Sequence, residues 1–330
     1  MSLITYDPSL RSLAEKALSD WGDPEENKKG LIHYPGGHAS LLNLALYGID
    51  ITNGELIGII GMEKSRKTTF VVNIFASIMT APTPIVKPRM AYLTLESGQP
   101  PERVRDLFVG MMATQRMMTL GTTTRMKRMP DGTDKEVSLL TLSPEFLKYN
   151  RRYTAQQGAI DYALAQISQW PIYIYGPHKE QGSTRKLDAI DRILTAEVEA
   201  GCKLVCLDHA QQVEVPSSSG NSMQQLAEVV GAFAGFIVSH GIAGILISQV
   251  SKGSVKDAHE GIDRIRAVGG KKLDEEANVV FVTRTPEDDS SKLIISMVAS
   301  RRAAPFAVKQ IINPASGLFI GPPVKHYDNS

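Results

Sequence analysis

The segment from Glu55 to Met79 limits the choice of folds more than any other part of the chain. It starts with the largely apolar run Glu55–Ile60, which has the length and composition of a strand buried in a parallel sheet. It ends with Thr68–Met79, which repeats apolar residues at helical spacing. A strand that leads through a short loop directly into a helix predicts an α/β fold.

The loop between this strand and helix predicts a nucleotide site, and it reads Gly61-Met62-Glu63-Lys64-Ser65-Arg66-Lys67-Thr68-Thr69. In a phosphate-binding loop, backbone N–H groups surround the phosphates, a lysine neutralises the β/γ charge and a hydroxyl ligates Mg²⁺. Lys67 and Thr68 stand at the positions of the last two roles. Arg66 stands where the pattern has glycine, so it either distorts the loop or adds a cation of its own. The alternative is an ordinary lysine-containing turn.

Length and charge restrict the remaining possibilities. The 330 residues predict one large domain, residues 31–330, after an N-terminal helix and linker within residues 1–30. With 36 basic and 35 acidic residues the net charge is +1, so any contact with nucleic acid must be local. Cys202 and Cys206 are expected to be core thiols in a reducing compartment. Because we find no signal sequence and no membrane-spanning run, we expect a cytoplasmic protein without a membrane partner.

Strands and helices alternate along most of the chain. Helices are expected at 184–200 and 222–240, and a methionine-rich insertion with a mobile tip from Gly110 to Asn150. This order predicts a mainly parallel sheet flanked by helices, which a C-terminal meander extends with antiparallel edge strands. The expected strands after the first are 90–95, 171–175, 203–207, 242–248, 279–283, 293–299, 307–312 and 317–320.

Three polar residues end core strands, where ligands bind in open α/β sheets. Asp208 follows an apolar strand and could hold Mg²⁺, although it could equally cap the next turn. Glu96 could activate a water molecule as a general base. Gln249 could hydrogen-bond a γ-phosphate and report its presence to the following loop. Alone, Glu96 and Gln249 would be weak signals.

Two basic features could act on other molecules. Segment 251–272 combines glycines with the basic residues Lys252, Lys256, Arg264, Arg266, Lys271 and Lys272, as expected for a loop that tracks a phosphate backbone. A solvated surface loop fits the composition nearly as well. Arg302, after the strand 293–299, could complete the site of a neighbouring subunit, or form only a surface ion pair.

Taken in order, these motifs resemble the RecA-like ATPase domain of DnaB-family replicative helicases, over nearly the whole chain. The motifs that carry the resemblance are the phosphate loop, Leu93-Thr94-Leu95-Glu96-Ser97, Leu207-Asp208-His209-Ala210-Gln211-Gln212, Ile245-Leu246-Ile247-Ser248-Gln249, Leu273–Val279 and Val298–Pro305. Arg66 in place of the loop glycine, Ser300 in place of a lysine and the lack of the large N-terminal domain depart from the family. A short, diverged member of this kind resembles a phage, plasmid or mobile-element protein.

The resemblance implies an ATP-dependent helicase, a hexameric ring that translocates on single-stranded DNA during replication, with ATP and Mg²⁺ and with a primase or loader as partner. By it, Lys67 binds phosphate, Thr68 and Asp208 serve Mg²⁺, Glu96 activates water, Gln249 senses hydrolysis and Arg302 acts in trans. Two alternatives stay open: an ATP-binding assembly or loading factor with little hydrolysis, and a RecA-like recombination filament.

Overall fold

The computed structural model describes residues 54–80, 87–96, 100–149, 153–176, 185–215, 222–249, 271–300 and 305–325. The expected N-terminal helix and linker therefore lie outside the described residues. Within those ranges, none of the helices combines the length and the apolar character that crossing a membrane requires.

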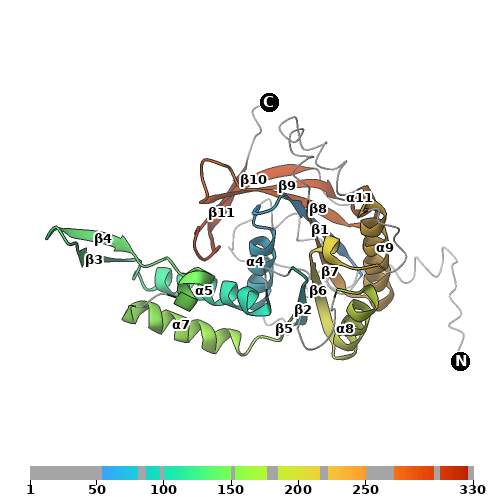
Figure 1. The fold of residues 1–330 in the computed structure, drawn as a ribbon, viewed down its shortest axis with the longest axis horizontal. Coiled ribbons are helices and arrows are strands. Elements are labelled where there is room, and N and C mark those ends of the chain that lie inside the picture. Colours follow the sequence, from blue (N-terminus) through green and yellow to red (C-terminus); the bar gives the residue numbers. More distant parts are fainter. Residues whose placement is uncertain are drawn as a thin grey trace, which may run out of the picture.

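A nine-stranded sheet forms the centre of the described structure (Figure 1). Its strand order is β11-β10-β9-β8-β1-β7-β6-β2-β5. In chain order these strands are β1 Leu56–Gly61, β2 Arg89–Thr94, β5 Ile172–Tyr175, β6 Cys202–Asp208, β7 Ala243–Gln249, β8 Val279–Arg284, β9 Lys292–Ser300, β10 Phe306–Ile312 and β11 Phe319–Lys325.

The direction of the strands divides the sheet into two parts. From β8 through β1, β7, β6 and β2 to β5, all neighbours are parallel. From β8 to β11, successive strands are antiparallel, as short connections allow. The predicted parallel sheet and the antiparallel C-terminal edge are thus confirmed.

Helices cover both faces of the sheet, because the apolar residues of a strand point alternately to either side. Ile57 and Ile59 of β1 pack into one core with helices α4 Lys67–Thr80, α5 Pro101–Thr119 and α7 Thr154–Ile167. Leu56 and Ile60 pack into a second core with α8 Leu187–Glu199, α9 Ser222–His240 and α11 Lys271–Glu276.

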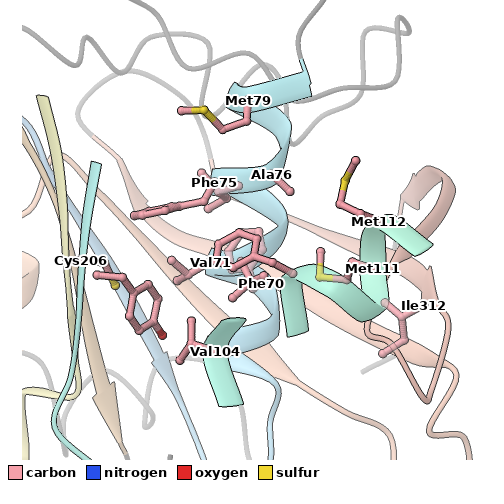
Figure 2. Close-up of a cluster of buried hydrophobic side chains, with 14 of the residues drawn as sticks. Phe70, Val71, Phe75, Ala76, Met79, Val104, Met111, Met112, Cys206 and Ile312 are labelled. Carbon is pink, nitrogen blue, oxygen red and sulfur yellow. The ribbon is translucent and has the colours of Figure 1, made fainter. Parts of the chain in front are cut away.

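The first core is built around α4, which is buried on most of its surface. Figure 2 shows Phe70, Val71 and Phe75 of this helix between the sheet, represented by Cys206, and Met111 of α5. The Phe70 ring meets the Phe281 ring edge-on, with the ring centroids 5.6 Å apart. Each fully buried phenylalanine contributes roughly 1.5–3 kcal/mol, so this packing holds the start of α4 firmly against the sheet. Cys206 and Cys202 are buried free thiols, as expected.

The expected insertion differs from the structure at its start. Residues 110–119 form the second half of α5, whose Met111 and Met117 are buried in the core, so an insertion beginning at Gly110 is wrong. The chain then forms a hairpin of β3 Thr124–Arg128 and β4 Asp134–Ser138, followed by the short helix α6 Pro144–Tyr149. The expected turn around Gly132 is the tip of this hairpin.

Candidate active site

The phosphate loop connects the carboxyl end of β1 to the first turn of α4. The Phe70 N–H donates to the Arg66 carbonyl oxygen at 2.9 Å and so closes the first turn of the helix. The N–H groups of Lys67, Thr68 and Thr69 precede it and have no acceptor within a helix of this geometry. The loop also folds tightly, since a Cβ at Gly61 would lie 2.3 Å from Ser65 Oγ. The loop therefore presents a helix N-terminus to any anion beyond it.

Two loop residues other than glycine adopt left-handed backbone angles, Lys64 with φ 64° and Arg66 with φ 61°. Arg66 thus keeps the backbone conformation that a glycine would favour, at a strain of about 1 kcal/mol. Its guanidinium donates long hydrogen bonds to the carbonyl oxygens of Pro314, at 3.3 Å, and Ser290, at 3.4 Å. Arginine therefore does not distort the loop backbone. Its side chain ties the loop to two turns of the antiparallel part of the sheet.

Lys67 is buried at the start of α4. Its ammonium group donates to the carbonyl oxygens of Gly61, at 2.9 Å, and Met62, at 2.5 Å. Burial lowers the pKa of Lys67 from 10.5 to about 8, and the nearby carboxylates of Asp208, Glu96 and Glu63 only partly oppose this. The lysine charge is therefore poorly compensated in the absence of an anion.

Asp208, the last residue of β6, is buried beside Thr68. One oxygen, Oδ2, accepts hydrogen bonds from Thr68 Oγ1 at 2.8 Å and from the Tyr92 hydroxyl at 2.5 Å. Burial raises the pKa of Asp208, whereas Tyr92, Thr68 and Lys67 favour its ionised form. A hydroxyl and a carboxylate held in contact are oxygen ligands of the kind that Mg²⁺ prefers.

Gln211 joins the ends of β6 and β7. Its amide nitrogen donates to Ser248 Oγ at 2.7 Å and to the Gln249 carbonyl oxygen at 2.9 Å, and its amide oxygen accepts from the Gln249 N–H at 3.0 Å. Sequence reasoning placed Gln211 in a motif but gave it no role. The structure indicates that it fixes the backbone of Gln249.

A cavity of about 520 Å³ lies at the carboxyl ends of the parallel strands. The expected residues that line it come from the phosphate loop and from the ends of β2, β6 and β7: Glu63, Lys64, Arg66, Lys67, Thr68, Thr69, Glu96, Asp208 and Gln249. Gly61, Met62 and Ser65 belong to the same loop but do not line the cavity. The structure thus brings together on one cavity wall expected residues separated by up to 186 positions, from Glu63 to Gln249, because β1, which precedes Glu63, and β7, which ends at Gln249, are neighbours in the sheet.

Other wall residues had no distinguishing sequence signal. Pro314 and Ala315 lie in the turn between β10 and β11, where Asn313 Oδ1 accepts hydrogen bonds from the N–H groups of Ala315 and Ser316. His209 is buried next to Asp208, and burial lowers its pKa. The remaining wall residues are Arg103, Leu107, Ser143, Pro144 and Glu145, from α5 and the start of α6.

A second cavity, about 630 Å³, lies between α5, α6 and α7. It is larger than the first, but none of the expected site residues lines it. Arg103 and Glu145, whose side chains form an ion pair at 3.1 Å, line both cavities. Chemistry rather than size therefore identifies the first cavity as the candidate active site.

Several expected residues cannot be placed in this way. Arg302 and the basic residues Lys252, Lys256, Arg264 and Arg266 lie outside the described residues. Lys271 and Lys272 begin α11, where Lys272 pairs with Glu276 at 2.6 Å. A role in binding DNA stays a prediction for the six basic residues of this segment, and a role in trans stays a prediction for Arg302.

The mainly parallel sheet with its antiparallel edge, the loop after β1 and the polar strand ends are features of a RecA-like α/β fold. Comparison with solved structures gives particular neighbours. One is the ATPase domain of a phage DnaB-like helicase, with a TM-score of 0.67 at 13% identity over 96% of this chain and 99% of that one. Another is a DnaB-like replicative helicase studied with primase, with a TM-score of 0.65 at 14% identity over 96% and 68%.

No protein-family model matches the sequence, and no curated protein matches it either. The structural likeness therefore establishes the fold, and it confirms the fold expected from the resemblance to DnaB-family helicases.

Proposed function

We propose that the chain is an ATP-hydrolysing, helicase-like motor that forms a hexameric ring and translocates on single-stranded DNA. The observation that carries this proposal is the cavity in which Lys67, Thr68, Asp208, Glu96 and Gln249 meet. The fold shared with the phage helicase ATPase domain and with a DnaB-like replicative helicase adds support.

Each residue has a role that suits its position. The poorly compensated charge of Lys67 neutralises the β- and γ-phosphates, for which the ammonium group exchanges its loop carbonyl contacts. Glu96 lies after the end of β2 and accepts the proton of the attacking water. Gln249 contacts the γ-phosphate end, and Gln211 couples its backbone to β6.

Thr68 and Asp208 are the residues that would hold Mg²⁺. Their oxygens already lie 2.8 Å apart on the cavity wall, and two protein oxygens suffice for an ion that keeps several waters. When bound, the ion supplies positive charge to the phosphate oxygens. A ring arrangement would add Arg302 from a neighbouring subunit, and the segments after β6 and β7 would contact single-stranded DNA.

The rate of ATP hydrolysis, with and without single-stranded DNA, tests this proposal. We expect hydrolysis that rises at least about tenfold with DNA, because coupled motors release product faster on their track. Glu96→Gln should bind ATP normally and hydrolyse it at least about 100-fold more slowly. Nucleotide binding with negligible hydrolysis in both conditions would reject the motor.

Arg66 supports a second candidate, an ATP-gated assembly or loading factor. Its guanidinium joins the phosphate loop to the turns at Ser290 and Pro314, so nucleotide could change the relation between these segments without turnover. For this candidate we expect nucleotide-dependent oligomerisation, measured by light scattering, without hydrolysis. Brisk DNA-stimulated hydrolysis would count against it.

A further inference from the structure

The β3–β4 hairpin is exposed on both faces. All residues of β3 are exposed, and in β4 only Val137 is half-buried. Figure 1 shows the hairpin extending past α5 and α7, away from the main sheet and from α9. A two-stranded sheet without a packed face is marginally stable by itself. Its side chains therefore contribute little to the core, and their arrangement needs another explanation.

The charges of the hairpin are sorted by face. The register pairs Arg125 with Val137 and Lys127 with Lys135, and these four side chains share one face. The acidic residues of the two strands lie on the other face. There, Asp134 is directly opposite Arg128, and Glu136 accepts a hydrogen bond from Thr124 Oγ1 at 2.6 Å. The charged side chains on one face of the strands are thus all basic, whereas the other face carries one base and two acids.

The basic face is not arranged for stability. Like charges directly opposite each other, as in the pair Lys127 and Lys135, destabilise an antiparallel sheet. Asp131, the acid in the turn of the hairpin, already accepts hydrogen bonds from the N–H and hydroxyl groups of Thr133. At the base, the Arg125 guanidinium lies 3.9 Å from the centroid of the Tyr153 ring, which ties the hairpin to the start of α7. The face is therefore held in position, with a charge that an anionic partner would neutralise.

We propose that this face of the hairpin binds the phosphate backbone of duplex DNA. Residues two apart on a strand are roughly 7 Å apart, which is about two axial steps of roughly 3.4 Å between the phosphates of one DNA strand. Single-stranded DNA is usually held on aromatic side chains, and neither β3 nor β4 contains one. A two-stranded ribbon also fits the major groove of a duplex. This contact uses a part of the chain other than the segments after β6 and β7 that are proposed to hold single-stranded DNA, and it does not depend on ATP hydrolysis.

The test compares neighbouring positions on opposite faces. Lys127→Gln and Arg128→Gln each remove one positive charge from an exposed residue of β3, so they alter net charge equally and leave the core intact. Affinity of the full chain for a fluorescent duplex of about 20 base pairs would be measured from roughly 50 to 200 mM salt. A single strand of the same length, and the rate of ATP hydrolysis, would be measured in parallel.

We expect Lys127→Gln to weaken duplex binding about three- to fivefold and to reduce the salt slope by about 1. The double variant, Lys127→Gln with Lys135→Gln, should weaken duplex binding about tenfold or more and reduce the slope by about 2. Arg128→Gln should change duplex affinity less than twofold, and single-strand affinity and hydrolysis should stay unchanged in all variants.

Four results would overturn the proposal. Equal losses from Lys127→Gln and Arg128→Gln would mean that only net charge matters. Undiminished duplex affinity in the double variant, or no duplex affinity in the wild type, would mean that the face does not bind DNA and is either only solvated or bound by an acidic protein partner. A loss confined to single-stranded DNA would contradict the choice of duplex. Absent hydrolysis with intact duplex binding would instead reject the proposed motor and leave this contact standing.

Discussion

Two ionic clusters lie near opposite ends of the parallel strands, and they differ in how well their charges are matched. At the amino end of β2, Arg89 donates two hydrogen bonds to the buried Glu197 carboxylate, at 2.7 and 2.8 Å, and stacks on the Tyr173 ring at 3.5 Å. The Tyr175 hydroxyl donates to the same carboxylate. The hydrogen bond with Glu197 raises the pKa of Arg89. This cluster is complete without a ligand.

The cluster at the carboxyl ends is incomplete by comparison. Lys67 donates to neutral carbonyl groups, and burial lowers its pKa to about 8. Burial likewise raises the pKa of Asp208. Both buried charges are disfavoured until an anion and a cation arrive. The difference indicates that matched buried charges are compatible with a stable fold as long as both partners are present, whereas unmatched ones mark the binding site.

Lys67→Ala should give the largest effect. We expect ATP hydrolysis to fall at least about 1000-fold, because the phosphates lose a buried cation, a loss of about 4 kcal/mol of transition-state stabilisation. The free energy of unfolding should stay within about 1 kcal/mol of the wild type, since the charge that is removed was unfavourable there. Steady-state hydrolysis and urea unfolding measure the two quantities. A large loss of stability would mean that Lys67, like Arg89 and Glu197, is matched within the fold and does not mark a binding site.

Glu197→Gln should show the opposite pattern. It leaves Arg89 without its bidentate partner, and we expect the free energy of unfolding to fall by about 2–4 kcal/mol. Hydrolysis by the folded protein should stay within about twofold of wild type, because the cluster is remote from the cavity. Replacing both residues, with Arg89→Met and Glu197→Leu, should recover most of the stability in urea unfolding. Loss of hydrolysis in a folded Glu197→Gln protein would contradict the assignment of the Arg89 cluster to the fold alone.

The same comparison shows what a sequence can predict. The strand ends at Asp208, Glu96 and Gln249 were predictable, because apolar runs reveal strands and parallel strands place their carboxyl ends together. The edge strands β9 to β11 followed from short turns between apolar runs.

Other features depended on tertiary contacts that leave no local pattern. Pro314 and Ala315 reach the cavity only because the turn between β10 and β11 lies against the phosphate loop and α4. Glu197 meets Arg89 from a helix 108 positions away. The start of the insertion was misplaced because the methionines of α5 were interpreted as part of a turn-prone segment, although Met111 and Met117 face the core. Flexible methionine fills cores as well as surfaces, so composition alone did not distinguish the two.

The pH dependence of stability sharpens the comparison for Lys67. Its pKa is about 8 in the folded protein against an ordinary value of 10.5, so between these pH values the unfolded chain binds more protons. The contribution of Lys67 to stability should therefore rise with pH across this window, by at most about 3 kcal/mol. We expect the difference in unfolding free energy between wild type and Lys67→Met to rise accordingly in urea titrations. A difference that is flat with pH would show that the lysine is not desolvated.

A bound nucleotide should reduce this slope, because the phosphates stabilise the charged ammonium group and return its pKa towards the ordinary value. Repeating the titration with a saturating, non-hydrolysable ATP analogue measures this effect. The Arg89 cluster serves as the control, since nucleotide should not alter the pH dependence of the Glu197→Gln protein relative to wild type.

Arg66→Gly should produce the smallest change. It tests whether Arg66 acts mainly in the structure of the loop or mainly in binding nucleotide. Because its φ is already 61°, glycine should keep the loop shape, and the relief of about 1 kcal/mol of strain is offset by the greater freedom of the unfolded chain. We expect kcat to stay within about twofold and KM for ATP to rise about two- to fivefold, since only a cation near the phosphates is lost. Arg66→Lys, which keeps the charge and the strain, should bring KM most of the way back to the wild-type value.

A tenfold or greater rise in kcat for Arg66→Gly would instead mean that the arginine restrains turnover, because a loop freed from Ser290 and Pro314 would then close on the nucleotide more readily. That outcome would favour the ATP-gated assembly factor over the motor.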